Sequence, residues 1–212
     1  MASLTFYYGS GSPYAWRVWL ALEHKGIPYE MKTLSFDAGD NKRPDFLAFN
    51  PRGLVPVIID DGFVLYESAV IVEYLEDTRP QSPRLFAAEP RERALQRRLV
   101  REVDQYVAPA VMKFATLRRA AASGSSEEQI DGATTDLGKE LARWERMVAG
   151  DYLAGAFSVA DITLYPQVAI AQRVVTRLKG ALPSFSSRDT LERMVLEMVE
   201  AVSESHPAVP SC

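Results

Sequence analysis

The sequence predicts an α+β protein in which a part that mixes strands and helices is followed by an all-α part. Strand-like runs and a hairpin signal are confined to residues 1–79, and after them apolar residues recur at helical spacing. Between the two parts, the stretch "TRPQSPRLFAAEP" holds three prolines and a serine, which is typical of a linker. We therefore expect a first domain at 1–79, a linker at 80–90 and a helical domain at 91–212.

The first domain opens with a strand, a helix and a second strand. A β-branched and aromatic run at residues 4–8 predicts the strand, and residues 13–25 predict a buried helix that Gly26 closes. Proline suits the first position of a helix, so Ser12, which precedes Pro13, is the expected N-cap. The run "PYEMKTL" predicts the second strand.

A hairpin and a helix complete this domain. In "VPVIIDDGFVLYES", apolar strands flank Asp61-Gly62, a dipeptide that is typical of a tight hairpin turn. The run "SAVIVEYLED" after it has helical spacing, with Ser68 as the expected N-cap. The predicted order is therefore β-α-β, an irregular stretch, and then β-β-α.

The helical domain is expected to contain helices at 91–120, 127–148, 159–176 and 189–203. The small polar run "AAASGSSEE" predicts a loop between the first two. Before the third helix, Ser158 and Asp161 form a capping-box pattern, which we interpret as structural.

Composition excludes several classes of function. The 212 residues carry a net charge of −4, and neither part is basic enough for nucleic-acid binding. Charge interrupts the apolar stretches before the roughly 18 residues that a membrane span needs, and no leader pattern opens the chain, so we expect a cytoplasmic protein. The single cysteine, Cys212, cannot build a disulfide framework or a metal site. Thiol chemistry would therefore have to come from a ligand.

Three motifs together resemble those of the cytosolic glutathione transferases. They are "SPYAWRVWLALEHKGIPYE", "NPRGLVPVIIDDGFVLYES" and "FSVADITLYP", and they follow the order and spacing of that family over nearly the whole chain. The first is similar to the serine-type motif of bacterial or plant-like classes. The resemblance implies a thioredoxin-like domain that binds glutathione and a helical domain that shapes a pocket for an electrophile. It also implies glutathione as co-substrate, no permanently bound cofactor and a homodimer.

The resemblance assigns glutathione-binding roles within the second motif. Pro56 matches the cis-proline of the family, so the backbone of Val55 would pair with the cysteinyl part of glutathione like an added strand. Glu67 and Ser68 stand at a helix start, where backbone N–H groups and the Ser68 hydroxyl can hold the γ-glutamyl carboxylate. Glu67 would then pair with the ammonium group of the ligand.

The glycine carboxylate of glutathione needs a cation. Lys42 matches the lysine of plant-type members of the family, and Arg43 and Arg52 are the substitutes. Leu54, which we keep among the expected contacts, stands where the family usually carries Lys or Gln before the Val-Pro pair. This departure from the family pattern weakens the carry-over at position 54, and Lys42 is the expected partner of the carboxylate because of its own match.

Ser12 is the expected catalytic residue. It matches the serine of the serine-type classes, and a hydroxyl at a helix start can donate a hydrogen bond to a thiolate. Two rivals stay open. Tyr8 lies close to where tyrosine-type members carry their catalytic phenol, and Ser10 lies on the same loop as Ser12.

Contacts to the electrophile are expected from the first helix of the helical domain. Tyr106, Met112 and Phe114 are aromatic or polarizable residues near its expected active-site end. The homodimer would use "YLEDTRP" and "QRRLVREVDQY", whose mixture of aliphatic and charged residues could meet a second subunit.

The resemblance favours a glutathione transferase that activates the glutathione thiol for conjugation to an apolar electrophile, a detoxification reaction. The alternative on the same fold is a glutathione-dependent isomerase or reductive enzyme. A zeta-like isomerase would be expected to carry "SSCS" where this chain has "GSPY". A non-catalytic ligand-binding or scaffold protein is the other alternative, although a scaffold has no need of Ser12, Val55-Pro56 and Glu67-Ser68.

Overall fold

The computed structural model describes residues 4–120, 126–148 and 151–177. The chain divides into two compact units, Met1–Ala87 (unit 1) and Ala88–Cys212 (unit 2), so the division falls inside the stretch expected to be a linker. Each unit is described by itself. The predicted helix at 189–203 and Cys212 lie outside the described residues.

Unit 1 is built on a four-stranded sheet with the order β2-β1-β3-β4. Strands β1 (Leu4–Gly9) and β2 (Glu30–Leu34) are parallel, because α1 (Pro13–His24) connects them. Strands β3 (Val57–Asp60) and β4 (Phe63–Tyr66) form the antiparallel hairpin, and α3 (Ser68–Thr78) follows it. The predicted order of elements is confirmed.

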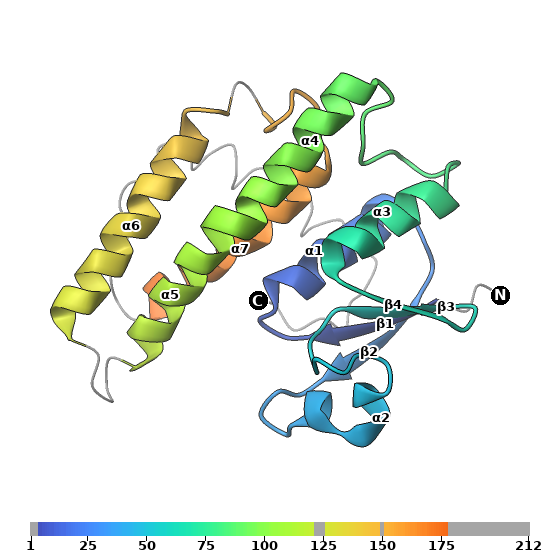
Figure 1. The fold of residues 1–212 in the computed structure, drawn as a ribbon, viewed down its shortest axis with the longest axis horizontal. Coiled ribbons are helices and arrows are strands. Elements are labelled where there is room, and N and C mark those ends of the chain that lie inside the picture. The colour runs from blue at the N-terminus through green and yellow to red at the C-terminus, as the bar shows by residue number, and fades with distance from the viewer. Residues whose placement is uncertain (1–3, 121–125, 149–150, 178–212) are drawn as a thin grey trace. The chain divides into compact units, whose positions relative to one another are not determined.

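Helices cover both faces of this sheet (Figure 1). Alternate residues of β1 point to opposite faces, so Tyr8 packs edge-on against Trp19 of α1, with ring centroids 5.4 Å apart. Tyr7 packs on the other face against Phe46 of the short helix α2 (Pro44–Leu47) and against Phe49. The stretch expected to be irregular thus contains α2 and the 3₁₀ turn η1 (Asp40–Lys42), which cover the second face.

Two of the predicted turn and cap signals can be checked residue by residue. The hairpin turn has Asp61 at φ 49° and Gly62 at φ 86°, which is the backbone that Asp-Gly favours in a two-residue hairpin. Ser68, in contrast, is not the N-cap of α3. Glu67 occupies that position, and Ser68 is the first residue of the helix. Its Oγ accepts a hydrogen bond from Nη1 of the buried Arg17, 51 residues earlier in the chain.

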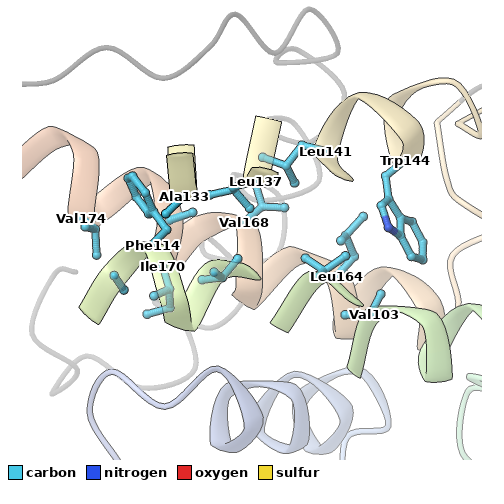
Figure 2. Close-up of a cluster of buried hydrophobic side chains, with 14 of the residues drawn as sticks. Val103, Phe114, Ala133, Leu137, Leu141, Trp144, Leu164, Val168, Ile170 and Val174 are labelled. Atoms are coloured by element: carbon cyan, nitrogen blue, oxygen red, sulfur yellow. The ribbon is translucent and has the colours of Figure 1, made fainter. Parts of the chain in front are cut away.

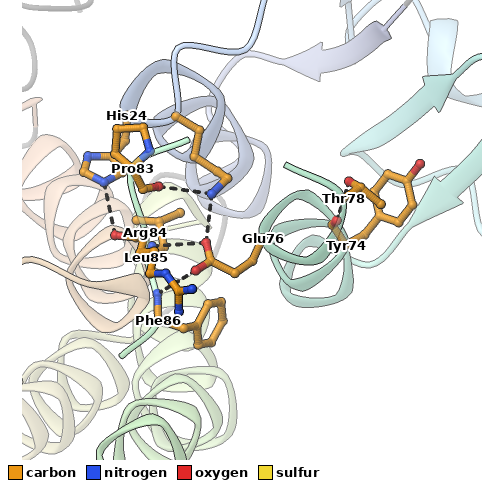
Figure 3. Close-up of polar contacts among 9 residues, drawn as sticks. His24, Tyr74, Glu76, Thr78, Pro83, Arg84, Leu85 and Phe86 are labelled. Atoms are coloured by element: carbon orange, nitrogen blue, oxygen red, sulfur yellow. Dashed lines mark hydrogen bonds and ion pairs between the residues drawn. The ribbon is translucent and has the colours of Figure 1, made fainter. Parts of the chain in front are cut away.

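The stretch after α3 is bound to the helices of unit 1 through a buried ion pair (Figure 3). The Glu76 carboxylate accepts a hydrogen bond from Lys25 Nζ at 2.8 Å and from the backbone N–H groups of Leu85 at 3.1 Å and Phe86 at 3.4 Å. Lys25 Nζ also donates to the carbonyl of Pro83. Three backbone groups of the chain after α3 therefore complete the hydrogen bonding of this carboxylate and this ammonium group.

Unit 2 contains four helices within its described residues: α4 (Pro90–Glu102), α5 (Ala108–Arg119), α6 (Glu127–Glu145) and α7 (Val159–Arg177). The single helix predicted at 91–120 is interrupted by a π-helical turn, η2 (Val103–Val107). Pro109 has no N–H to donate to the carbonyl four residues before it, which explains why the α-helical pattern fails at this place.

The core of unit 2 is almost entirely apolar (Figure 2). Phe114 of α5, Leu137 and Trp144 of α6, and Leu164 and Val168 of α7 are each 4% exposed or less. The start of α7 is polar but fully bonded. The Asp161 carboxylate accepts from the N–H of Ser158 at 2.8 Å, from its hydroxyl and from the N–H of Leu153. The structural role predicted for this motif is confirmed, although the Ser158 hydroxyl accepts from Ala160 rather than from Asp161.

None of the helices that the structure describes combines the length and the apolar character needed to cross a bilayer.

Candidate functional site

The pairing of the strands brings four segments to one end of the sheet in unit 1. At that end Gly9, the last residue of β1, lies opposite Leu34, the last residue of β2. Val57, the first residue of β3, lies opposite Tyr66, the last residue of β4. The loop to α1, the loop after β2, the turn before β3 and the start of α3 therefore all leave the sheet at this end. They carry the residues for which the sequence predicts glutathione binding.

Ser12 is the N-cap of α1, as predicted. Its Oγ accepts a hydrogen bond from the N–H of Ala15 at 3.2 Å, and its own N–H donates to the carbonyl of Gly9 at 3.2 Å. A hydroxyl can accept and donate at the same time. Because the capping bond uses a lone pair of Oγ, the hydrogen of the hydroxyl is left to donate to a group outside the helix.

The two rivals of Ser12 are placed differently. Tyr8 lies on the face of the sheet that α1 covers, and its ring packs against Phe6 and against Trp19, in the second turn of α1. Ser10 is exposed in the turn between β1 and α1, next to Gly11 at φ 83°. Ser12 alone of the three is positioned by the capping geometry of a helix start.

The turn before β3 is held by buried asparagines. The peptide bond between Val55 and Pro56 is cis, as the resemblance implies. Asn41 donates to the carbonyl of Gly53 at 2.7 Å and Asn50 donates to the carbonyl of Leu54 at 2.8 Å. Among the described residues, no hydrogen bond engages the backbone N–H or carbonyl of Val55. The turn thus presents a fixed backbone donor and acceptor.

The start of α3 combines a strained residue with open N–H groups. Glu67 has φ 75° and ψ 104°, an unusual backbone for a residue with a side chain, and such outliers gather at functional sites. Its side chain makes no capping bond, so within the described chain the first N–H groups of α3 are not satisfied by their N-cap. Ser68 is buried and Glu67 is exposed. The site combines partial positive charge from the helix with an accessible carboxylate.

Lys42, one of the three cations predicted for the glycine carboxylate, lies beside the turn before β3. Gly53 has φ 63°, and a Cβ added there would come within 2.9 Å of Lys42 Nζ and 2.7 Å of the Asn41 carbonyl. The ammonium group of Lys42 therefore lies beside the residue that precedes Leu54 and Val55. Arg43 is in an exposed ion pair with Asp45, whose oxygen lies 3.5 Å from Arg43 Nε. Arg52 and Leu54 are exposed.

Comparison with known proteins connects this geometry to a family. A model of the glutathione S-transferase N-terminal domain matches residues 11–78. Maleylacetoacetate isomerase of Rattus norvegicus is 32% identical over 198 residues, which cover 91% of this chain and 87% of the rat protein. Glutathione S-transferase 1 of Dianthus caryophyllus is 31% identical over 169 residues, 78% of this chain and 76% of the plant protein. The chain belongs to the glutathione S-transferase family.

A solved structure of the same family confirms the fold. The crystal structure of a glutathione S-transferase from the Antarctic clam Laternula elliptica superimposes with a TM-score of 0.79 at 28% sequence identity. The match covers 97% of this chain and 92% of the clam chain. The α+β fold predicted from the sequence, a thioredoxin-like N-terminal unit followed by a helical one, is therefore confirmed.

The residues predicted to contact the electrophile have different environments in unit 2. Tyr106 in η2 is 51% exposed and Met112 in α5 is 43% exposed. Phe114 is only 1% exposed, because its ring packs into the core between α5, α6 and α7 (Figure 2). The assignment of Phe114 to an open pocket is therefore wrong, since helical spacing alone does not say which face of a helix is buried.

Met112 also lines a groove within unit 2. The groove has a volume of about 620 Å³ and is lined by side chains of α5 and α6, among them Leu117, Ala133 and the exposed ion pair between Lys113 and Asp136. Within the described residues, His, Cys, Asp and Glu nowhere gather in a group of three that could hold a metal ion.

Sequence reasoning missed one aromatic residue at the sheet end. Phe36, in the turn after β2, is 43% exposed, and its ring lies against Gly9. The only signal in the sequence is an aromatic residue in a polar turn, "LSFDAGD", which does not reveal what the ring contacts.

Proposed function

We propose that this member of the family is a glutathione-dependent enzyme in which the Ser12 hydroxyl holds the sulfur of glutathione as a thiolate. The observation that carries the proposal is the capping bond from Ala15 N–H to Ser12 Oγ, which fixes the hydroxyl at the start of α1 and leaves its hydrogen to donate. The residues proposed to bind the two carboxylates of glutathione lie at the same end of the sheet. The thiolate is the nucleophile that attacks the second substrate.

The energy required is within reach of this arrangement. A free thiol has a pKa of about 8.5, and lowering it to about 6.5 requires roughly 2.7 kcal/mol of preferential stabilisation of the thiolate. A hydrogen bond to a charged acceptor contributes roughly 1.5 to 3 kcal/mol, and a helix start contributes about 0.3 to 2 kcal/mol. One hydroxyl at a helix start is therefore sufficient without a metal or a second base.

The remaining parts of glutathione match the open groups at the sheet end. In the proposed binding mode, the cysteinyl backbone pairs with the N–H and carbonyl of Val55. The γ-glutamyl carboxylate accepts from the first N–H groups of α3 and from Ser68, with Glu67 facing the ammonium group. Lys42 pairs with the glycine carboxylate. Each contact is the same in the ground state and the transition state, so these residues set affinity rather than rate.

For the second substrate, we favour isomerisation of an unsaturated acid over conjugation. The sequence motifs alone favoured conjugation, but the rat relative that covers 91% of the chain is named a maleylacetoacetate isomerase. Conjugation is the second candidate, because the carnation relative is named a glutathione S-transferase. The chain performs either reaction, in this proposal, with Ser12 and the thiol of glutathione, since "GSPY" brings no cysteine to the site.

Both reactions share the first step. The thiolate adds to one carbon of a double bond or ring conjugated to a carbonyl or nitro group, so that a C–S bond forms and the π electrons move onto the oxygen of that group. In isomerisation, the former double bond rotates as a single bond. The enolate then re-forms it in the trans arrangement and expels the thiolate. In conjugation, the adduct takes up a proton or loses another leaving group, and glutathione is consumed.

The role of Ser12 is tested by titrating the ultraviolet absorbance of the bound thiolate against pH. In Ser12→Ala, we expect the pKa of bound glutathione to rise by about one to two units and turnover at neutral pH to fall about tenfold or more. Ser12→Thr keeps a hydroxyl and should keep a lowered pKa. If Tyr8→Phe shifts the titration and Ser12→Ala does not, the catalytic residue is Tyr8. Ser10→Ala is the corresponding test of the other rival.

Loss of the helix cap needs its own control, because Ser12→Ala also removes the bond to Ala15. Ser126 caps α6 in unit 2 with the same geometry, its Oγ accepting from Gln129 N–H at 3.2 Å. Ser126→Ala should cost a similar amount of stability, about 1 kcal/mol, and leave the thiol pKa unchanged. A shift of the thiol pKa in Ser126→Ala would assign the Ser12→Ala effect to stability.

The two candidate reactions are separated by measuring glutathione itself. Maleylacetoacetate and a chloronitroarene are each supplied with glutathione, and both the organic product and the remaining thiol are quantified. An isomerase converts the cis acid with a trace of glutathione and leaves the thiol unconsumed, whereas a transferase consumes one thiol per product. Binding of glutathione with no turnover of either substrate would favour the scaffold alternative.

We also propose that the protein is a homodimer. The support is the family to which the chain belongs, together with the mixture of aliphatic and charged residues in "YLEDTRP" and "QRRLVREVDQY". Sedimentation at micromolar concentration should show a dimer, and a monomer alone would contradict the proposal.

A further inference from the structure

Leu54 is an exposed apolar side chain in the turn before β3. It is 56% exposed, although it lies between Gly53 and Val55, which are both buried. Exposed single apolar residues are common on proteins, so exposure alone carries no argument. The argument depends on where the proposed pairing of glutathione with Val55 places the third residue of the tripeptide.

The proposed pairing fixes the direction of the ligand. In that binding mode, the cysteinyl residue exchanges hydrogen bonds with both the N–H and the carbonyl of Val55. Two residues exchange both bonds in this way when their chains run antiparallel, whereas in a parallel pair the two bonds of one residue go to different residues of the partner. Val55 precedes Pro56, which favours the extended backbone that such a pair needs. In the proposed mode, the ligand therefore runs antiparallel to residues 53–55.

The antiparallel direction places the third residue of the tripeptide opposite Leu54. In such a pair, the residue that follows the cysteinyl residue faces the residue that precedes Val55. The terminal carboxylate of the ligand then continues toward Gly53. Lys42 Nζ lies at this place, 2.9 Å from the point where a Cβ of residue 53 would stand. The direction derived from the pairing thus agrees with Lys42 as the partner of the carboxylate.

The hydrogen bonds and burial of the turn agree with the same register. Next to a hydrogen-bonded pair, an antiparallel ladder has a pair whose residues make no bonds to each other and whose side chains lie closer together. The Leu54 carbonyl needs no bond from the ligand, because Asn50 Nδ2 donates to it at 2.8 Å. Val55 is buried and Leu54 is exposed, which is the alternation of an extended chain. A side chain on an L-residue opposite Leu54 would lie on the same face as the leucine.

We propose that Leu54 forms an apolar subsite for a side chain on the third residue of the thiol peptide, so that the protein binds γ-glutamyl-cysteinyl tripeptides with an apolar third residue more tightly than glutathione. This inference rests on the proposed function and extends it to the identity of the thiol substrate. Glycine has no side chain and leaves Leu54 exposed, whereas an L-leucyl residue buries apolar surface of both side chains. Lys or Gln, which the family usually carries at this position, would place a polar group there instead.

Three tripeptides that differ only in their third residue test the inference without any turnover. They are glutathione, γ-glutamyl-cysteinyl-L-leucine and γ-glutamyl-cysteinyl-D-leucine, and calorimetry measures the Kd of each. The wild type should bind the L-leucyl peptide about two- to fivefold more tightly than glutathione, which is the range expected for one cross-strand apolar pair. The D-leucyl peptide has the same composition but presents its side chain to the other face. It should bind no more tightly than glutathione.

Variants of two leucines with equal exposure localise the effect. In Leu54→Ala and in Leu54→Asn, which keeps the size of the side chain and makes it polar, the advantage of the L-leucyl peptide over glutathione should disappear. Leu54→Met keeps a large apolar side chain and should keep the advantage. Leu95, on α4 in unit 2, is 55% exposed, and Leu95→Ala is the matched control that should show the preference of the wild type.

The outcomes separate the inference from the proposed function. If the wild type binds none of the three peptides, the proposed glutathione site itself is wrong. If the wild type binds glutathione, and the L-leucyl peptide binds no more tightly than glutathione or than the D-leucyl peptide, the inference is overturned. The same holds if Leu54→Ala keeps the preference of the wild type, because another surface would then hold the leucyl side chain.

Discussion

The sheet end of unit 1 and the helical core of unit 2 use buried polar side chains for different purposes. In unit 1, Asn41 and Asn50 donate to the carbonyls of Gly53 and Leu54, and the backbone of Val55 next to them stays open. In unit 2, Asp161 in the first turn of α7 accepts from the N–H groups of Leu153 and Ser158, in the segment before the helix. In the first case the polar side chains hold a turn whose neighbouring backbone N–H and carbonyl stay open, and in the second case they satisfy backbone N–H groups directly.

This difference predicts that substitutions in the two units separate binding from stability. Loss of a polar group at the start of α7 should lower the free energy of unfolding and leave affinity for glutathione intact. Loss of a polar group at the sheet end should lower the affinity for glutathione and leave the free energy of unfolding intact. A substitution that lowers both the free energy of unfolding and the affinity for glutathione would contradict this comparison.

The largest effect is expected for Asp161→Ala. The substitution leaves the buried N–H groups of Leu153 and Ser158 without their acceptor, so we expect the free energy of unfolding to fall by about 2 to 4 kcal/mol. Urea unfolding measures the loss, and glutathione Kd should be unchanged where the variant is folded. Asp136→Ala, which removes an exposed partner of Lys113, is the matched control and should change stability little.

A smaller and purely functional effect is expected for Lys42→Ala. If Lys42 pairs with the glycine carboxylate, the KM for glutathione should rise several-fold with little change in kcat, because the contact is the same in the ground and transition states. Urea unfolding should match the wild type. Arg43→Ala and Arg52→Ala are controls of equal charge change, and a rise in KM in either of them but not in Lys42→Ala would move the role to that arginine.

The smallest effect is a pH dependence in unit 1. Burial lowers the pKa of His24 below its usual 6.5, against the hydrogen bond with the Arg84 carbonyl and the nearby Glu76, and with Lys25 acting in the same direction as burial. The unfolded chain therefore takes up this proton at a higher pH than the folded protein. The stabilising effect is complete above about pH 6.5 and is lost as the pH falls through that value toward the lower folded pKa.

His24→Gln should remove this contribution. We expect the free energy of unfolding of the variant to fall less between about pH 7 and pH 5 than that of the wild type, as followed by urea unfolding at each pH. Parallel curves for the two proteins would show that His24 does not titrate differently on folding.

Local signals in the sequence predicted much of unit 1. The Asp61-Gly62 turn and the Ser12 cap each depend on residues within a few positions of one another, and sequence patterns report such contacts directly. Ser68 was misplaced by one position. Its hydroxyl serves Arg17, which lies 51 residues away, and no local pattern could indicate that partner.

The misses in unit 2 have a different cause. Helical spacing predicted where the chain is helical, but it could not decide that Phe114 is buried while Met112, two residues away, is exposed. The π-helical turn at Val103–Val107 had one available signal, Pro109, because a proline in a helix withdraws a donor. Phe36 was missed because its ring lies against Gly9, which belongs to β1 and is far from Phe36 in the sequence.

The ion pair of Lys25 with Glu76 has a consequence for how the protein can be divided (Figure 3). A fragment that stops at residue 78, where the family match ends, would retain both charges and lose the backbone groups of Pro83, Leu85 and Phe86 that complete their bonding. The transferable module is therefore longer than the folded sheet and helices suggest. A chimaera that joins unit 1 of this glutathione S-transferase to another helical domain should be joined after Ala87. The fragment then keeps the backbone groups that complete the bonding of Lys25 and Glu76.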